Sequence, residues 1–343
     1  MENKEVCAIV VTYNRKKLLI ECLIALMKQT KQLDAIYIID NASTDGTHSY
    51  LNEKGYINEI PPHNSTEPWE KTLQISLAQF FADKTIHTSS NLTIHYVRMC
   101  ENTGGAGGFY EGVKRGCEKG YDWLWLMDDD AKPKKNALEK LLEINPIQSN
   151  VYGSVAAYYE NDYLKICSPC AVTQEKENQT RIELQKDLTK LQEVNSIPFL
   201  GFFISSKLVE TIGLPDRNFF ISADDVEYCL RAKRNGSKII FVKDSIILHP
   251  FSECHIFKLV GRKFYYLRLT PWRRYYDVRN KILIARHYYK SELYTKTLPG
   301  LLVRLIATIL YEKDSIRQIK FFCKAVKDGM LGINGRKVLP GSM

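Results

Sequence analysis

The 343-residue sequence lacks several features that would place it in a class at once. It has no unbroken apolar run near the ~18 residues that a membrane-spanning helix needs. Its first residues, Met-Glu-Asn-Lys-Glu, do not have the shape of a signal peptide, and no internal repeat is visible. We therefore expect a cytoplasmic protein rather than a secreted or integral membrane protein.

The sequence also lacks a metal framework of cysteines and the common phosphate-binding motifs. The nine cysteines are scattered, and the CxxC pair of Cys167 and Cys170 has no second pair at zinc-ribbon spacing. Without an export signal the thiols are expected to be reduced. Neither a P-loop nor a GxGxxG pattern is present. A disulfide scaffold and a zinc ribbon are both disfavoured.

Acidic residues are scarce in one part of the chain. Residues 255–290 hold ten Lys or Arg and nine aromatic residues against a single acidic residue, Asp277, within a chain of formal charge +9. Such a segment could meet nucleic acid, an anionic membrane surface or a phosphate-bearing substrate. Charge alone does not choose among them.

Strand and helix signals alternate over the first 250 residues. Short runs rich in β-branched residues predict strands, and apolar residues at helical spacing predict helices. The predicted strands are 6–12, 35–40, 92–98, 123–127, 199–205 and 239–242, and the predicted helices are 16–30, 47–54, 108–120 and 225–235. This alternation predicts an α/β protein with a doubly wound, mostly parallel, Rossmann-like sheet.

The chain is longer than the roughly 250–300 residues at which a single core stops growing. We expect a catalytic domain over residues 1–254 and a basic, helical C-terminal region over 255–343. Two insertions are expected within the domain. Residues 57–90 would contain an amphipathic helix at 69–81, and residues 171–195 would form a mobile or helical excursion.

Three aspartates follow the apolar run 123–127. If strand geometry persists, Asp128 and Asp130 point the same way and Asp129 the other. Two hard oxygen ligands on one face suit Mg²⁺ or Mn²⁺. A solvated acidic turn is the alternative, but ligands of open α/β sheets gather at the carboxyl ends of the strands. The triplet therefore predicts a divalent metal site.

A glycine-rich segment precedes the triplet by one strand–helix unit. Residues 102–109, Asn-Thr-Gly-Gly-Ala-Gly-Gly-Phe, follow a predicted strand and open a helix. Glycines let the backbone approach a ligand, and a helix N-terminus offers unpaired N–H groups to an anion. We expect this segment and the triplet to open onto the same edge of the sheet.

Two later features could complete a site. Asp224 and Asp225 begin a predicted helix, where capping is the structural alternative; one could cap while the other faces the cleft as a general base. His249 ends a strand and is by default a half-buried histidine. If its strand points into the same cleft, His249 could be a nitrogen ligand to the metal.

Taken in order, these motifs resemble the inverting family 2 glycosyltransferases of GT-A fold. They are Val-Val-Thr-Tyr-Asn at 10–14, Asp-Asn-Ala-Ser-Thr-Asp at 40–45, the Asn-x-Gly-Gly loop, the Asp-x-Asp ending and the later Asp-Asp. The resemblance covers roughly residues 5–250. Gly-Gly-Ala-Gly-Gly-Phe and Asp-Asp-Val-Glu-Tyr are most similar to the bacterial galactofuranosyltransferases.

The resemblance implies a role for each matching position. It implies that Asp128 and Asp130, with His249, hold Mn²⁺ or Mg²⁺, and that Asp225 is the base with Asp224 as its neighbour and fallback. The implied donor-binding residues, with Asp40 at a pyrimidine, are Thr12, Tyr13, Arg15, Asp40, Asn41, Asn102, Gly104, Gly105 and Asp129. The family often has an aromatic residue where this chain has Ala223, which leaves the acceptor-sugar platform unidentified.

The resemblance implies a metal-dependent inverting glycosyltransferase that extends a bacterial surface or cell-wall glycan. Galactofuranose from UDP-galactofuranose is the first expectation, and rhamnose from dTDP-rhamnose is the alternative. A sugar nucleotidyltransferase is the alternative from a different class, but residues 12–17 lack the glycines of its signature loop. A non-enzymatic binding module would leave the acidic triplet and Asp225 unexplained.

The C-terminal region predicts peripheral contact with an anionic membrane surface. Residues 255–330 combine Lys and Arg, aromatic residues and apolar residues at helical spacing. We expect attachment to the inner face of the cytoplasmic membrane, where a lipid-linked acceptor would be found, and no nucleic acid partner. The alternative is that the aromatics pack under the catalytic sheet and the arginines bind acceptor phosphates or pair with acidic residues.

Overall fold

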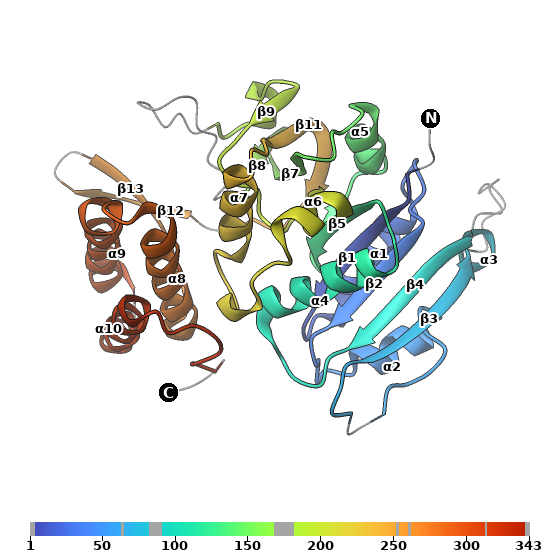
Figure 1. Cartoon of the computed structure of the whole chain (residues 1–343), viewed down its shortest axis with the longest axis horizontal. Helices are drawn as coiled ribbons and strands as arrows, with labels where there is room; N and C mark the ends of the chain where they lie inside the picture. The colour runs from blue at the N-terminus through green and yellow to red at the C-terminus, as the bar shows by residue number, and fades with distance from the viewer. Residues whose placement is uncertain are drawn as a thin grey trace.

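The computed structural model describes residues 4–62, 65–81, 91–167, 182–251, 254–259, 262–312 and 314–339. Figure 1 shows an α/β unit built on one long sheet, and beside it a group of C-terminal helices next to a small hairpin.

The sheet is mixed, with a parallel half that carries the predicted motifs. Its strands are β1 (Val6–Thr12), β2 (Ala35–Asp40), β3 (Trp69–Ser76), β4 (Asn91–Arg98), β5 (Trp123–Asp128), β6 (Lys132–Pro133), β7 (Val151–Glu160), β8 (Tyr163–Ile166), β9 (Leu191–Glu193), β10 (Phe202–Ser205) and β11 (Ile239–Leu248). They pair in the order β3-β4-β2-β1-β5-β10-β7-β11-β6, with β8 on β7 and β9 on β11. Strands β4, β2, β1 and β5 are mutually parallel, as are β7 and β11, whereas β3 and β10 are antiparallel to their neighbours. The predicted fold class is confirmed.

Helices cover both faces of this sheet. They are α1 (Lys16–Met27), α2 (Thr47–Glu53), α3 (Leu77–Phe81), α4 (Gly104–Glu118), α5 (Ala137–Glu143), α6 (Ser206–Ile212) and α7 (Asp224–Arg234). Alternate residues of β5 belong to the two cores, with Trp123 and Trp125 on one face and Leu124 and Leu126 on the other, all fully buried. The central strands are therefore apolar throughout.

Glycines bring α4 close to the sheet. A Cβ on Gly108 would lie 2.5 Å from the Val11 side chain, and one on Gly112 would lie 2.4 Å from Ile9. Helix α4 begins at Gly104, not at residue 108 as the sequence predicted, so the glycine-rich run forms the first turns of the helix. The N-terminus of α4 is thereby fixed at the end of the parallel strands.

The prediction of an amphipathic helix at 69–81 is wrong. Residues 69–76 form edge strand β3, paired antiparallel with β4 along its whole length, and only Leu77–Phe81 is helical. Strand β4 would otherwise leave a row of backbone N–H and C=O groups unpaired, and this tertiary pairing overrides the local helical spacing. Residues 63–64 and 82–90 of this predicted insertion lie outside the described residues.

The second predicted insertion is only partly described. Residues 171–181 lie outside the described part of the chain. The remainder is not a regular α-helix: it contains a 3-10 turn at Gln185–Asp187 and strand β9, which pairs with β11.

The C-terminal region forms a hairpin and a helical unit. Hairpin β12 (Cys254–Leu259) and β13 (Arg262–Leu267) precedes α8 (Pro271–Ile284), α9 (Leu298–Tyr311) and α10 (Ser315–Leu331), with π-helical turns at Ala285–Tyr289 and Leu293–Thr297. These helices enclose a hydrophobic core that also includes Phe220, from the segment before α7.

Part of the basic aromatic segment is interior to this unit. Tyr275 and Tyr276 are fully buried and donate hydrogen bonds to Asp328 Oδ2 (2.6 Å) and the Val338 carbonyl (2.8 Å). Arg274 is buried, and its guanidinium lies 2.6 Å from the carboxylate of Glu312, the residue that follows α9. These side chains are packed inside the protein, as the alternative in the sequence analysis predicted, and are not available to a membrane.

One helical stretch is longer and more apolar than the sequence analysis allowed. Residues Leu293–Tyr311 form 19 consecutive, mostly apolar helical residues, and only 22% of the most apolar part of this stretch is buried inside the protein. Among the described residues this is the one helix with the length and composition to cross a membrane. Length and composition alone do not separate a spanning helix from one that packs on a protein core. The expectation of no such run was wrong by this criterion.

Candidate active site

A cavity of about 520 Å³ opens at the carboxyl ends of the parallel strands. The sequence-predicted residues that line it are Thr12, Tyr13, Arg15, Asn41, Asn102, Gly104, Gly105, Asp128, Asp129, Asp224, Asp225 and His249. Segments far apart in the sequence therefore meet at one edge of the sheet, as expected. Two predicted residues, Asp40 and Asp130, do not line the cavity.

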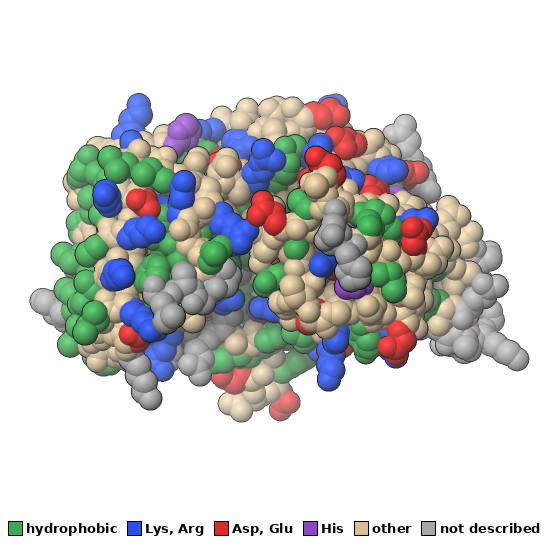
Figure 2. Space-filling view, turned by 90° about the horizontal axis from the view of Figure 1, so that it is seen from below, with side chains coloured by type: hydrophobic (Ala, Val, Ile, Leu, Met, Phe, Trp, Pro, Cys, Tyr) green, Lys and Arg blue, Asp and Glu red, His purple; other side chains and the backbone are tan. Residues whose placement is uncertain are grey.

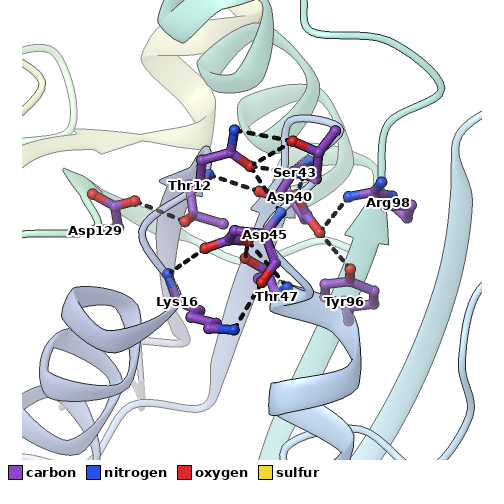
Figure 3. Close-up of polar contacts among 11 residues, drawn as sticks. Thr12, Lys16, Asp40, Ser43, Asp45, Thr47, Tyr96, Arg98 and Asp129 are labelled. Carbon is purple, nitrogen blue, oxygen red and sulfur yellow. Dashed lines mark hydrogen bonds and ion pairs between the residues drawn. The ribbon is translucent and has the colours of Figure 1, made fainter.

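The acidic triplet is tied to the end of β1. Thr12 donates a hydrogen bond from Oγ1 to Asp129 Oδ2 (2.7 Å), as Figure 3 shows. The Arg15 guanidinium contacts Asp129 Oδ1 at 3.3 Å and Asp130 Oδ2 at 2.7 Å. Neighbouring parallel strands β1 and β5 thus present a cation and three carboxylates side by side.

The alternation expected along the triplet is not observed. Strand β5 ends at Asp128 and the chain turns, so Asp129 faces Thr12 and the cavity, while Asp130 is directed to Arg15 and His249. The His249 Nε2 atom lies 3.3 Å from Asp130 Oδ1. Strand geometry did not persist past the last residue paired with β1, but the turn still brings His249 to the triplet, as anticipated.

The electrostatics of this corner fit a divalent cation. Burial and the nearby carboxylates of Asp130 and Asp129 raise the pKa of Asp128 to about 7. Burial disfavours the charged form of His249, yet its pairing with Asp130 raises its pKa to about 10. No three acidic, histidine or cysteine side chains in the described ranges are already arranged around one point as a metal centre. The carboxylates suit a hard cation, but Asp130 is paired with Arg15 and His249, so Asp130 would have to release Arg15 and His249 would have to lose its proton before the two could hold a metal ion.

Asp40 lies outside the cavity, at the buried end of β2. It is fully buried, and its carboxylate accepts hydrogen bonds from Tyr96 Oη (2.7 Å), Arg98 (2.8 Å) and the Ser43 N–H (2.8 Å), as seen in Figure 3. A pyrimidine contact, which the resemblance implied, would require one of these partners to move. In the observed position Asp40 fixes the turn after β2.

Asn41 joins that turn to the glycine-rich segment. Its amide donates to the Gly104 carbonyl (2.8 Å), and its Oδ1 accepts from the N–H and hydroxyl of Thr103 (2.9 Å each). Asn102 Oδ1 in turn accepts from the Gly104 N–H (2.8 Å). The backbone of Gly104 has φ +75°, and a Cβ there would lie 2.0 Å from the Phe220 carbonyl oxygen. This position therefore requires glycine.

The aspartate pair stands in the first turn of α7. The N-cap is Ala223 and makes no side-chain cap, so the expected division into one capping and one cleft-facing aspartate is not observed, and both line the cavity. Burial and repulsion from Asp225 raise the pKa of Asp224 well above the usual carboxyl range. Burial raises the pKa of Asp225 to about 6, against a hydrogen bond from the Val226 N–H (2.7 Å). Burial is the first cause of both shifts, so both carboxyl groups of the pair hold a proton more tightly than an exposed aspartate does.

The segment before the pair is strained and clamped. Phe220, Ser222 and Ala223 all have positive φ, at 65°, 71° and 63°. The fully buried Asn280 of α8 donates from Nδ2 to three carbonyls of this segment, those of Phe219 (3.1 Å), Ile221 (2.9 Å) and Ser222 (2.7 Å). Its neighbour Arg279, also fully buried, donates to the carbonyls of Asn218 (3.3 Å) and Phe219 (3.1 Å).

Sequence reasoning missed part of the cavity wall. Trp272 and Arg273, at the start of α8, line the cavity. The sequence analysis assigned their segment to a membrane surface, with packing of the aromatics and binding of acceptor phosphates by the arginines as the alternative. The segment around Phe220–Ser222 lines it too and carried no motif. The dense aromatic and basic run was a visible signal, but only the docking of α8 on the segment before α7 places it beside Asp224 and Asp225.

Comparisons with known proteins agree with this geometry. Family models described as "Glycosyltransferase like family 2" and "Glycosyl transferase family 2" match residues 78–264 and 7–58. The chain is 24% identical over 255 residues to the dTDP-rhamnosyl transferase RfbF of Shigella flexneri, covering 71% of this chain and 80% of that protein. It is 23% identical over 309 residues to the galactofuranosyltransferase GlfT1 of Mycolicibacterium smegmatis, covering 86% and 84%.

Solved structures share the fold. Residues 1–349 of S. aureus TarS, in complex with UDP-GlcNAc, match with a TM-score of 0.54 at 15% identity, covering 96% of this chain and 81% of that one. GalNAc-T7, solved with UDP, GalNAc and Mn²⁺, matches with a TM-score of 0.55 at 14% identity, covering 97% of this chain and 57% of that one. Because one family model alone spans more than half of the chain, and the cavity lies where the motifs predicted it, the chain belongs to the family 2 glycosyltransferases of GT-A fold.

Proposed function

We propose that this glycosyltransferase transfers a sugar from a nucleotide-sugar donor to a glycan hydroxyl by a metal-dependent, inverting displacement. The observation that carries the proposal is that one cavity contains the carboxylates at the end of β5 and the aspartate pair of α7. The first group suits a cation and a diphosphate, and the second suits proton removal. A nucleotidyltransferase is disfavoured by the family match.

Asp225 acts as the base. A sugar hydroxyl is a poor nucleophile, so Asp225 accepts its proton while the oxygen forms a bond to the anomeric carbon of the donor. The bond from that carbon to the diphosphate breaks in the same step, which inverts the anomeric centre. Its pKa of about 6 keeps Asp225 ionised near neutral pH and more basic than an ordinary aspartate. Asp224, whose pKa burial and Asp225 raise well above the usual carboxyl range, is the fallback candidate.

The donor lies along the ends of β1, β2 and α4. Thr12, Tyr13 and Arg15 line the nucleoside end, with Asn41, Asn102, Gly104, Gly105 and Asp129 along the nucleotide and sugar. Asp128 and Asp130, with His249, would hold Mn²⁺ or Mg²⁺. When bound, such a cation neutralises charge on the departing diphosphate.

The donor is UDP-galactofuranose, and dTDP-rhamnose is the alternative. Relatives named for each sugar are similar to this chain at comparable identity, but the alignment with the galactofuranosyltransferase is longer, 309 residues against 255. The acceptor is a bacterial cell-surface or cell-wall glycan, attached to a lipid.

A panel of nucleotide sugars tests the proposal. With Mn²⁺ present, UDP-galactofuranose is expected to release UDP and to protect the protein against heat more than dTDP-rhamnose does. Tighter dTDP binding in calorimetry would instead support the rhamnosyl alternative. Full turnover in excess EDTA would contradict metal dependence, and undiminished turnover in Asp225→Asn would contradict the assignment of the base.

We also propose that α9 and α10 attach the enzyme to the anionic inner face of the cytoplasmic membrane. The large exposed apolar side chains of these two helices are Leu302, Ile309, Leu310, Tyr311, Ile316, Ile319 and Leu331. Figure 2 shows hydrophobic and Lys or Arg side chains interspersed over the end of the molecule where these helices lie. Each basic residue near an anionic surface adds about 1 kcal/mol, and apolar groups beside it can enter the headgroup region.

Flotation with liposomes tests the attachment. The protein is expected to float with anionic vesicles, less so at high salt, and the double variant Leu310→Asp, Ile316→Asp should abolish flotation. Ile147→Asp is the matched control, because Ile147 is 60% exposed on the catalytic domain. Equal partitioning onto neutral and anionic vesicles would contradict an electrostatic contribution, and no partitioning would contradict attachment itself.

A further inference from the structure

The first turn of α8 is part of the cavity wall. Trp272 and Arg273 line the same cavity as Asp224 and Asp225. Helix α8 is held there from within the protein, because Arg279 and Asn280, about two turns further along the helix, bind the carbonyls before α7. The position of the two side chains relative to the aspartate pair is therefore fixed by buried hydrogen bonds.

The Trp272 ring is supported on one side and open on another. It is half-buried and contacts Tyr276 edge-on, with ring centroids 6.4 Å apart and an interplanar angle of 80°. Ile221, from the segment before α7, packs against the same apolar cluster. The indole thus lies on the side of the cavity formed by that segment, where the acceptor hydroxyl must approach Asp225. It is also the side on which Ala223 stands, where the family often has an aromatic residue.

Arg273 is a cation without an acidic partner in the described part of the chain. The guanidinium lies 5.3 Å from the centroid of the Trp272 ring, and the residue is exposed to the cavity. Burial and the positive charge of Arg15 lower its pKa, which places both guanidiniums in one electrostatic environment. Arg15 is already paired with Asp129 and Asp130, so Arg273 is the cation of the two that can bind an anionic ligand in the cavity.

We propose that the first turn of α8 completes the substrate site, with Trp272 as the platform for the acceptor sugar ring and Arg273 as an anchor for a phosphate. This inference rests on the proposed function. The face of a sugar ring that carries C–H groups is apolar and can lie against an aromatic side chain, and Trp gives the largest such surface. The guanidinium offers paired donors to a phosphate, which belongs either to the donor or to a lipid-phosphate acceptor.

Acceptor kinetics test the role of Trp272. With octyl galactofuranoside and octyl rhamnoside as soluble acceptors, Trp272→Ala should raise the acceptor KM about tenfold, or ~1.4 kcal/mol, while UDP and dTDP affinities stay unchanged. Trp272→Phe should recover most of the loss. The control is Tyr294→Ala, since Tyr294 is 63% exposed on the C-terminal unit. An unchanged acceptor KM in Trp272→Ala, or an equal loss of nucleotide affinity, would overturn the assignment.

A binding measurement separates this inference from the proposed function. Titrating the octyl glycosides against the intrinsic fluorescence should give a signal that Trp272→Phe removes, because Trp123 and Trp125 are fully buried and Trp69, on edge strand β3, does not line the cavity. This readout needs no turnover. If the octyl glycosides still change the wild-type fluorescence while no nucleotide sugar is hydrolysed, the proposed function is contradicted and Trp272 is still supported as the sugar platform. If the wild-type signal is missing, the platform fails even in an active enzyme.

Arg273→Gln identifies the phosphate. Weaker UDP binding in calorimetry with Mn²⁺, by about tenfold, would assign Arg273 to the donor diphosphate. Unchanged UDP binding with a higher KM only for a polyprenyl-diphosphate-linked acceptor would assign it to the acceptor. No change in either measurement would overturn the anchoring role. Thermal unfolding of the variant provides the check that its fold is intact.

Discussion

The clamp made by Asn280 predicts a specific defect. In Asn280→Ala, the carbonyls of Ile221 and Ser222 lose a buried donor, whereas the Phe219 carbonyl keeps Arg279. Arg279 Nε loses its acceptor, Asn280 Oδ1, to which it donates at 2.9 Å. Each unsatisfied buried group costs roughly 1–3 kcal/mol, so two stranded carbonyls correspond to about 2–4 kcal/mol of unfolding free energy after partial relaxation. That is a large loss for a single domain, but it need not unfold the protein.

Catalysis should suffer as well. Residues in positive-φ conformations cost of order 1–3 kcal/mol each and persist only where the surroundings over-determine them. Without Asn280, the segment carrying Phe220, Ser222 and Ala223 can relax. A displacement of Asp225 by about 1 Å would reduce kcat by about 10²-fold, whereas nucleotide binding at β1 and β2 should be unaffected.

The assay combines urea unfolding, transfer kinetics and UDP calorimetry. Lys281→Ala is the matched control, because Lys281 follows Asn280 on the same helix and makes only an i,i+4 ion pair with Asp277 at the surface. A destabilised Asn280→Ala enzyme with wild-type kcat would refute the reasoning, since the clamp would then be structural only. Loss of UDP affinity in parallel with kcat would also refute it.

Three further outcomes are expected. Because only the ionised carboxylate accepts a proton, kcat/KM should fall as the pH drops through about 6, and Asp225→Asn should lower kcat by roughly 10²–10⁴-fold; greater damage in Asp224→Asn would reverse the assignment within the pair. Asp128→Ala should abolish Mn²⁺-dependent UDP binding in calorimetry while the melting temperature is retained, and intact binding would exclude Asp128 as a ligand. Gly104→Ala should be strongly destabilising in thermal unfolding, whereas Gly105→Ala should not, because a Cβ at Gly105 meets nothing within 4 Å; equal effects would contradict the close approach to Phe220.

The amino-acid sequence by itself determined the catalytic half of this protein. Strands 6–12 and 35–40 were predicted to the residue, because central parallel strands are apolar on both faces and end at sharp polar turns. The motifs that follow those strands were assigned to one edge of the sheet because the carboxyl ends of parallel strands must share it. That rule placed the acidic triplet and the glycine-rich segment at this edge, whereas the roles of Thr12, Asn41 and the other donor-binding residues came from the family resemblance.

Only the tertiary structure decided what depends on contacts between distant segments. The β3 strand owes its conformation to the open edge of β4, so its local spacing was misleading. The turn at Asp129–Asp130 is set by Thr12 and Arg15, and the burial of Asp40 by Tyr96 and Arg98. Trp272 reaches the cavity because Asn280 binds carbonyls some 60 residues earlier in the chain, with sequence separations of 58 to 61. Local patterns report a residue's own helix or strand, whereas such positions are fixed by hydrogen bonds and packing that form only when the chain has folded.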